Sequence, residues 1–308
     1  MTHIQQALFE LETDYAGHPY FVTGHALCNA LGRRVDGRTR QALQASHGVF
    51  VPGEYGEYPP EHSATGRAGT LGSSLPRVET YADLFLYRDV AQRWLLESPP
   101  RDAHNVHDIQ RYGDRLAFAS TCRSGRPPEM QKSQRTARWF LHCYLHAESD
   151  AGVLPVDETT LETLRVGGAR NYGFGELSLV DSQLVDLDQV SYSRLRDTEL
   201  QLELLTPYVL ASDYPGADDQ DVPWWWDPER PLRRRETRLQ DGGDAYALET
   251  VDHGQVVSFA GADPVRTAKN GIKRVGTHAK YGFGEFRLRP TSADRVPARS
   301  DSARGGEA

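Results

Sequence analysis

A fifteen-residue stretch of this chain occurs twice. The first copy runs from Arg165 to Leu179 and the second, 109 positions later, from Arg274 to Leu288. Nine of the fifteen aligned positions are identical, including an uninterrupted Tyr-Gly-Phe-Gly-Glu. A match of this density within one chain indicates two copies of one supersecondary unit. A length of 308 residues allows two domains, each with a modest core.

The same order of elements is predicted around each copy. A strand over 139–146 and a helix over 157–164 precede the first glycine loop, and a strand over 255–260 and a helix over 264–272 precede the second. Alternating apolar residues after each Gly-Phe-Gly predict a strand. The glycines therefore follow a helix and open a strand. A Rossmann loop does the reverse and a P-loop needs Gly-Lys-Ser/Thr, so neither motif is present here.

The composition of the loops favours contact with phosphate. Glycine permits positive φ and lets main-chain N–H groups approach an anion. Arg165, Arg170, Lys273, Arg274 and Lys280 add positive charge in or beside the loops. The alternative is a purely structural β-bulge or tight turn. Basic residues in both copies favour the phosphate interpretation.

The two helix–glycine loop–strand segments resemble the RAMP superfamily of CRISPR-associated RNA-binding proteins. The stretch Tyr20 to Leu31 also resembles the strand-to-helix entry of these proteins. The resemblance implies an α+β fold of two tandem ferredoxin-like (RRM-like βαββαβ) units. A plain unit needs about 80 to 90 residues, so the first half carries a large insertion.

The expected domains follow from this resemblance. Residues 1–195 form the first unit, with the insertion at about 48–135, residues 196–290 form the second unit, and residues 291–308 form a disordered tail. Three cysteines without Cys-x-x-Cys spacing indicate neither disulfides nor a zinc site, so no metal or cofactor is expected. No membrane-length apolar run or signal-peptide pattern occurs, which predicts a cytoplasmic protein without membrane contact.

The resemblance implies an RNA-binding function in antiviral defence. The leading expectation is a CRISPR RNA-binding subunit of a ribonucleoprotein effector complex, with CRISPR RNA and other effector subunits as partners. The residues expected to contact RNA are Gly167, Gly168, Arg170, Tyr172, Gly173, Gly175, Lys273, Arg274, Gly276, His278, Lys280, Gly282 and Gly284. A net charge of −8 argues against nucleic-acid binding, although three of the four lysines lie between Lys269 and Lys280.

Two alternative functions stay open. Another branch of the superfamily consists of metal-independent endoribonucleases that cut the CRISPR precursor transcript. A histidine near the position of His47 is the general acid/base in that branch, which makes His47 the catalytic candidate. Its possible partner groups are Tyr20, His25, Tyr55 and Lys280. The third possibility is a duplicated ferredoxin-like domain that binds a small anionic ligand.

Two aromatic clusters have ambiguous roles. His142, Tyr144 and His146 share one face of a predicted strand, where they either stack on bases or belong to the core. Three consecutive tryptophans, Trp224 to Trp226, cannot all be buried in a strand, so at least one is expected to be exposed or in an interface.

Overall fold

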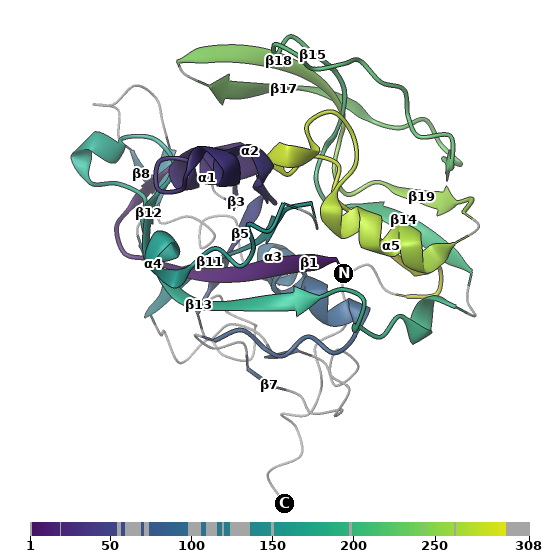
Figure 1. Cartoon of the computed structure of the whole chain (residues 1–308), viewed down its shortest axis with the longest axis horizontal. Coiled ribbons are helices and arrows are strands. Elements are labelled where there is room, and N and C mark those ends of the chain that lie inside the picture. Colours follow the sequence, from purple (N-terminus) through teal and green to yellow (C-terminus); the bar gives the residue numbers. More distant parts are fainter. Residues whose placement is uncertain are drawn as a thin grey trace, which may run out of the picture.

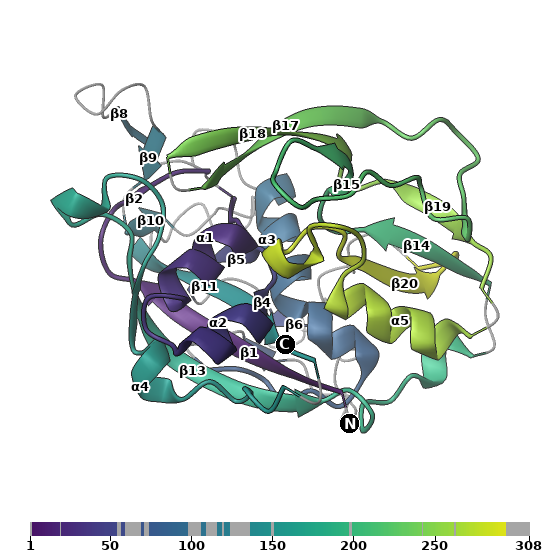
Figure 2. The ribbon, with the colours of Figure 1, turned by 45° about the horizontal axis from the view of Figure 1, so that its top comes forward.

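The computed structural model places antiparallel sheets and few helices in one α+β arrangement (Figures 1 and 2), which confirms the expected class. It describes residues 2–18, 20–53, 57–58, 69–70, 74–97, 106–108, 116–118, 120–123, 136–148, 151–196, 199–241, 243–261 and 263–293. The α-helices of this part are α1 (Gly24–Leu31), α2 (Gly37–Ala42), α3 (Leu86–Glu97), α4 (Glu158–Leu161) and α5 (Pro264–Lys273). None is long and apolar enough to cross a membrane.

The larger sheet is built around the N-terminal strand. Its order is β12-β13-β1-β11-β5-β3, and β1 pairs antiparallel with both β11 and β13. These strands are β1 (His3–Leu11), β3 (Phe21–Val22), β5 (Gly48–Pro52), β11 (Thr136–His146), β12 (Thr163–Arg165) and β13 (Glu176–Asp186). Apolar residues of α1 and α3 belong to the same core as β1, so both faces are covered and β1 is buried along most of its length.

The smaller sheet repeats the same local order. Its strands run β16-β19-β14-β20, with α5 packed against β20. They are β14 (Leu200–Leu204), β16 (Trp226–Asp227), β19 (Val256–Phe259) and β20 (Phe286–Pro290). In each sheet the first strand lies between the strand that follows the glycine loop and the strand that precedes it. The strand that each glycine loop opens, β13 or β20, therefore pairs directly with the first strand of its sheet, β1 or β14.

The remaining short strands surround these sheets. They are β2 (Tyr15–Ala16), β4 (Gln44–Ala45), β6 (Glu57–Tyr58), β7 (Gly69–Thr70), β8 (Val106–Asp108), β9 (Leu116–Phe118), β10 (Thr121–Arg123), β15 (Tyr208–Ser212), β17 (Arg234–Asp241) and β18 (Asp244–Val251). The β17–β18 hairpin and β15 form a separate three-stranded sheet, at the top of Figure 1.

Several predicted elements differ from the structure. The expected helix over 157–164 is only the four residues of α4, because Thr163 to Arg165 pair with β13 as a strand. The described residues between β14 and β19 form strands and no helix. The segment from β14 to β20 therefore lacks the first helix of a complete βαββαβ order. The expected tail lies outside the described residues from position 294 onwards, as does much of the expected insertion.

Helix α3, from the expected insertion, joins the two sheets. Arg88 forms an ion pair with Glu285 at 2.7 Å, and Arg287 pairs with Asp89 at 2.6 Å and with Glu203 at 2.9 Å. All five side chains are buried. Removing one member of such a buried pair leaves an uncompensated charge, at a cost of about 3–5 kcal/mol. The junction between the sheets is therefore specified by charge as well as by apolar packing.

Candidate functional site

The corresponding glycines of the two loops have similar backbone angles, whereas Ala169 is left-handed and its counterpart His278 is not. The positive φ values are 79° at Gly167, 88° at Gly173 and 70° at Gly175, against 98° at Gly276, 85° at Gly282 and 75° at Gly284. Val166 donates to the carbonyl of Gly175 at 3.0 Å, and Val275 donates to that of Gly284 at 3.2 Å. A Cβ at Gly175 or Gly284 would lie 1.9 or 2.0 Å from a main-chain oxygen. Backbone geometry therefore requires glycine at both positions.

The first loop faces outward. Its 3₁₀ turn, Arg170–Tyr172, follows Ala169 at φ 56°, and Tyr172 is 66% exposed. The N–H groups of Ala169, Arg170 and Asn171 donate no hydrogen bond to a described residue. A left-handed residue followed by a right-handed turn points successive N–H groups to one side, an arrangement that binds anions. This loop can contact a phosphate from solvent.

The second loop faces inward, against α1 and α2. The ring of Tyr281 packs edge-on to His25 with centroids 4.7 Å apart, and Lys280 Nζ donates to the carbonyl of Gln41 at 2.9 Å. His278 is buried and shares a 2.9 Å hydrogen bond with Ser212. Residues of this loop are thus a contact between the two sheets, and most of them are closed to a large ligand.

The solvent exposure of the expected RNA-contacting residues differs between the loops. Of those in the second copy, the buried ones are Arg274, His278, Gly282 and Gly284, while Gly276, Lys273 and Lys280 keep some exposure. In the first copy, Gly167, Gly168, Arg170, Tyr172 and Gly173 are exposed or partly exposed, and Gly175 is buried.

The last residue of the repeated Tyr-Gly-Phe-Gly-Glu motif pairs differently in each copy. Glu176 pairs with Arg165, the first residue of its own copy, at 2.6 Å on the surface. In the second copy Glu285 forms its ion pair with Arg88 of α3 instead. Arg274, the counterpart of Arg165, has φ 67° and ψ 155° and turns toward its own loop, where Nε donates to the carbonyl of Ala279 at 3.0 Å.

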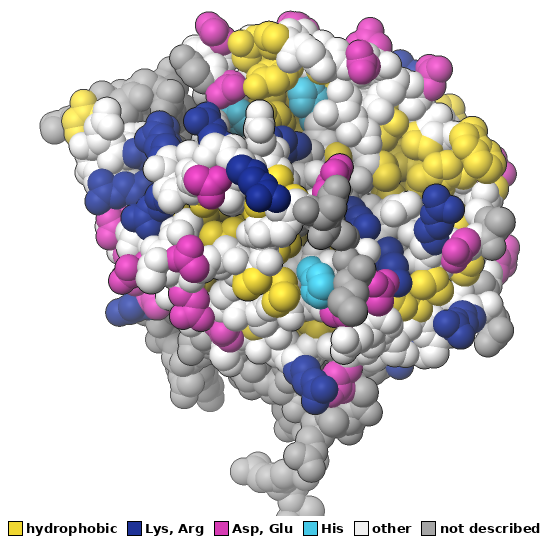
Figure 3. All heavy atoms as spheres, in the orientation of Figure 1, with side chains coloured by type: hydrophobic (Ala, Val, Ile, Leu, Met, Phe, Trp, Pro, Cys, Tyr) yellow, Lys and Arg dark blue, Asp and Glu magenta, His cyan; other side chains and the backbone are white. Residues whose placement is uncertain are grey.

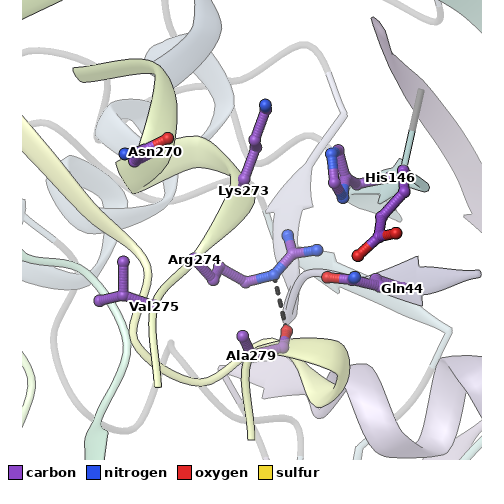
Figure 4. Close-up of a pocket in the computed structure, with 8 residues that line it drawn as sticks. Gln44, His146, Asn270, Lys273, Arg274, Val275 and Ala279 are labelled. Carbon is purple, nitrogen blue, oxygen red and sulfur yellow. Dashed lines mark hydrogen bonds between the residues drawn. The ribbon is translucent and has the colours of Figure 1, made fainter. Parts of the chain in front are cut away.

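Arg274 lines a cavity of about 360 Å³ between α5 and the strands β4 and β11 (Figure 4). The lining residues are Gln44, His146, Glu148, Asn270, Lys273, Arg274, Val275 and Ala279. In Figure 4 the guanidinium of Arg274 points toward the side of the cavity formed by Gln44 and His146. Burial, together with the charges of Arg274 and Lys273, lowers the pKa of His146 to about 3, so the ring is neutral at pH 7.

His47, the catalytic candidate, is enclosed. Its ring centroid lies 5.3 Å from Phe21 and 5.0 Å from Phe283, and Nδ1 accepts a hydrogen bond from the N–H of Gly24 at 3.4 Å. Burial is the main cause that lowers the pKa of His47 to about 3, with Arg88 contributing. The imidazole is therefore neutral at pH 7 and buried by its neighbours.

The groups considered as partners of His47 are dispersed among other contacts. His25 is buried with Nε2 3.5 Å from Asp241, and Lys280 is held at the end of α2. Tyr20 is exposed, and Tyr55 lies outside the described residues. Among the described residues, no group of three His, Cys, Asp or Glu side chains is placed to hold a metal ion.

The two aromatic clusters are resolved by burial. His142 stacks on Tyr87 of α3 at 4.5 Å and Tyr144 packs beneath Arg88, so these two side chains belong to the core, whereas His146 lines the cavity. Trp224 is 89% exposed whereas Trp226 is buried, which confirms that at least one tryptophan faces solvent.

A basic surface over α1 and α2 was missed from the sequence. Figure 3 shows Lys and Arg side chains gathered over these helices, at the left of the view. The exposed arginines of this segment are Arg33, Arg34, Arg38 and Arg40. Arg34 reaches the carbonyl of Thr160 in α4 at 3.2 Å, which connects this surface to the segment before the first loop. The four arginines lie within eight residues of the sequence, and this density could have predicted the basic surface.

Known proteins give limited similarity. No family model matches the chain, and no curated protein matches it. A CRISPR protein from Archaeoglobus fulgidus aligns with 10% identity over 84% of this chain and 92% of its own, at a TM-score of 0.30. A chain of the Type III-B Cmr-beta complex bound to cognate target RNA aligns with 9% identity over 82% of this chain and 86% of its own, also at 0.30.

Proposed function

We propose that this chain is an RNA-binding subunit of a CRISPR ribonucleoprotein, related to the RAMP superfamily, that acts in the cytoplasm in antiviral defence with other effector subunits as partners. The observation that carries the RNA-binding part is the outward-facing first loop. It combines N–H groups that donate no hydrogen bond to a described residue with the partly exposed Arg170 and the exposed Tyr172. The CRISPR assignment rests on the likeness of the two loop motifs to that superfamily.

Each group of the first loop has a defined task in this proposal. The N–H groups of Ala169 to Asn171 and the guanidinium of Arg170 contact phosphate oxygens, which gives affinity without sequence selection. The ring of Tyr172 stacks on a base, which contributes about 1–3 kcal/mol. The arginines over α1 and α2 extend the positive surface along the strand, so a net acidic chain still offers a basic path.

The same proposal accounts for the arrangement of the two sheets. Residues 1–195 and 196–290 are two ferredoxin-like units, and the second has β15 and the β17–β18 hairpin in place of its first helix. The second loop holds the units together through its contacts with α1 and α2. RNA contact in the second copy is then limited to its more accessible groups, Lys273, Gly276 and Lys280.

A binding role is favoured over the endoribonuclease by the surroundings of His47. A general acid/base must reach the ribose within hydrogen-bond distance. The ring of His47 is buried between two phenylalanines and is neutral at pH 7. A buried, neutral ring is poorly placed to exchange protons with bound RNA.

Salt-dependent RNA binding tests the proposal. Single-stranded RNA is titrated into the wild type, into Arg170→Ala/Tyr172→Ala, and into Arg196→Ala as an exposed-arginine control. The double variant should bind at least about 10-fold more weakly, with a slope of log affinity against log salt reduced by about 0.7. The control should match the wild type. Equal affinity of the double variant and the wild type at matched salt would contradict RNA contact by the first loop.

Incubation with a repeat-containing precursor transcript in EDTA separates binding from cleavage. The binding proposal predicts an intact transcript and co-purification of the chain with short, already processed RNA and partner subunits. Cleavage by the wild type that disappears in His47→Ala, with binding retained, would establish the endoribonuclease instead.

A further inference from the structure

We propose that the cavity beside Arg274 is a binding site for the phosphate group of a nucleotide. The phosphate can belong to RNA or to a free mononucleotide. If the phosphate belongs to RNA, this inference rests on the function proposed above. If it belongs to a free mononucleotide, the inference is independent of that function.

Arg274 combines an unusual backbone conformation with an unpaired side-chain donor. Its φ of 67° lies in a region that a non-glycine residue occupies at a cost of about 1–3 kcal/mol. The side chain is only 5% exposed, yet Nη2 has no hydrogen-bond partner in the described structure. The counterpart Arg165 has a carboxylate partner in Glu176, whereas no described carboxylate forms an ion pair with Arg274. An anion in the cavity would supply that partner.

A second unpaired polar atom belongs to the lining of the same cavity. His146 is 6% exposed, and its Nδ1, which is a donor in one of the two neutral tautomers, has no hydrogen-bond partner among the described residues. Unsatisfied buried polar atoms each cost about 1–3 kcal/mol, and they are rare without a ligand or an ordered water. Two of them, on side chains from different units, therefore indicate a built polar site.

The charge of the lining selects an anion. Lys273 and Arg274 supply positive charge, and the amides of Gln44 and Asn270 add neutral donors. Glu148 is the opposing carboxylate, and it is exposed. Burial lowers the pKa of Lys273, and a bound anion would offset this effect. Two cations in the lining disfavour a metal ion.

Size and geometry favour a phosphate ester over a bare ion. The volume of about 360 Å³ falls within the range of roughly 300–1,000 Å³ that is typical of small-molecule sites. A guanidinium presents donors in a planar fork that matches two phosphate oxygens. The phosphate would lie against Arg274 and His146, and the remaining volume would accommodate part of a sugar or base.

Calorimetric titration with four probes tests the site. The probes are uridine monophosphate, uridine, an RNA hexamer with a 5′-phosphate and the same hexamer with a 5′-hydroxyl. The first two probes form one pair and the two hexamers form the other, and the members of each pair differ only in the phosphate. In at least one pair, we expect the probe with the phosphate to bind at least 10-fold more tightly than the probe without it. Binding of uridine monophosphate indicates a free nucleotide as ligand, whereas discrimination between the hexamers alone indicates an RNA end. Equal binding within both pairs, or no binding by any probe, overturns the proposal.

Variants locate the binding in the cavity. Lys273→Ala should weaken phosphate-dependent binding at least 10-fold, and so should His146→Asn. Lys269→Ala, one turn earlier on α5 and paired with Asp188, is the matched control and should leave it unchanged. Unchanged affinity in both cavity variants, with folding verified by circular dichroism, would overturn the assignment. Arg170→Ala/Tyr172→Ala should keep the mononucleotide affinity, so failure of the RNA proposal is distinguishable from failure of this one.

Discussion

The two glycine loops of this protein have nearly the same sequence motif and similar backbone angles at their glycines, but different surroundings. The first exposes Tyr172 to solvent, whereas its counterpart Tyr281 packs against His25. The motif glutamate of the first copy is paired at the surface, and that of the second is buried against α3. A duplicated motif therefore fixes local geometry, while distant residues determine which copy meets solvent.

The largest expected difference concerns the first glycine of the Gly-Phe-Gly segment in each loop, Gly173 and Gly282. A Cβ at Gly282 would lie 2.4 Å from Nδ1 and 2.6 Å from the main-chain nitrogen of His47, whereas one at Gly173 would meet nothing within 4 Å. Gly282→Ala should cost about 2–6 kcal/mol from strain and overpacking together. Gly173→Ala should cost about 1–2 kcal/mol from its positive φ alone. Urea unfolding measures both, and equal costs would refute the packing of the second loop on His47.

The second comparison concerns the two motif glutamates. Arg88→Ala leaves Glu285 unpaired in the core and should lower the free energy of unfolding by about 3–5 kcal/mol. Arg165→Ala removes a surface pair and should cost less than about 1 kcal/mol. Thermal and urea unfolding of both variants provide the test. A large effect of Arg165→Ala would show that the first copy is not a surface site.

The third prediction is that acid lowers the free energy of unfolding through the two buried histidines near the second loop, His47 and His146. His47 and His146 have folded-state pKa values of about 3, below the unfolded value of about 6.5. Between these values the unfolded chain binds the proton and the folded chain does not, so stability present above pH 6.5 is lost as the pH falls. The slope is at most about 1.4 kcal/mol per pH unit for each histidine. His47→Gln should flatten the curve between pH 6.5 and 4.5, and an unchanged slope would contradict the enclosed state of His47.

The smallest expected effect concerns the basic surface over α1 and α2. Arg38→Ala should weaken RNA binding a few-fold, equally for different sequences, because one phosphate contact is lost. Its effect should be smaller than that of Arg170→Ala/Tyr172→Ala. A larger effect than the loop variant would move the main RNA contact from the first loop to α2. Fluorescence anisotropy at two salt concentrations distinguishes these outcomes.

Local patterns predicted much of the fold. The strand over 139–146 and the helix over 264–272 lie where periodicity placed them, within β11 and α5, and both glycine loops open strands. The helix over 157–164 was wrong in its second half, because tertiary pairing of Thr163 to Arg165 with β13 overrode the local pattern. The β17–β18 hairpin in place of a helix was likewise not anticipated.

The orientation of the loops could not be read from the sequence. It depends on Arg88, which is 197 positions from Glu285, and on His47 packing against Gly282. Such long-range contacts leave no local periodicity. The same is true of the cavity, where His146 at the end of β11 and Arg274 after α5 are 128 positions apart in the sequence.

Photo-crosslinking gives the most direct test of RNA contact by the first loop. Single-stranded RNA containing 4-thiouridine is irradiated on the wild-type protein, and the crosslinked peptides are identified by mass spectrometry. We predict that the main crosslink maps to the turn Arg170–Tyr172, and that the Tyr281 peptide of the second loop gives little or none. Crosslinks concentrated at Tyr281 or at Trp224, with none in the first loop, would contradict the account.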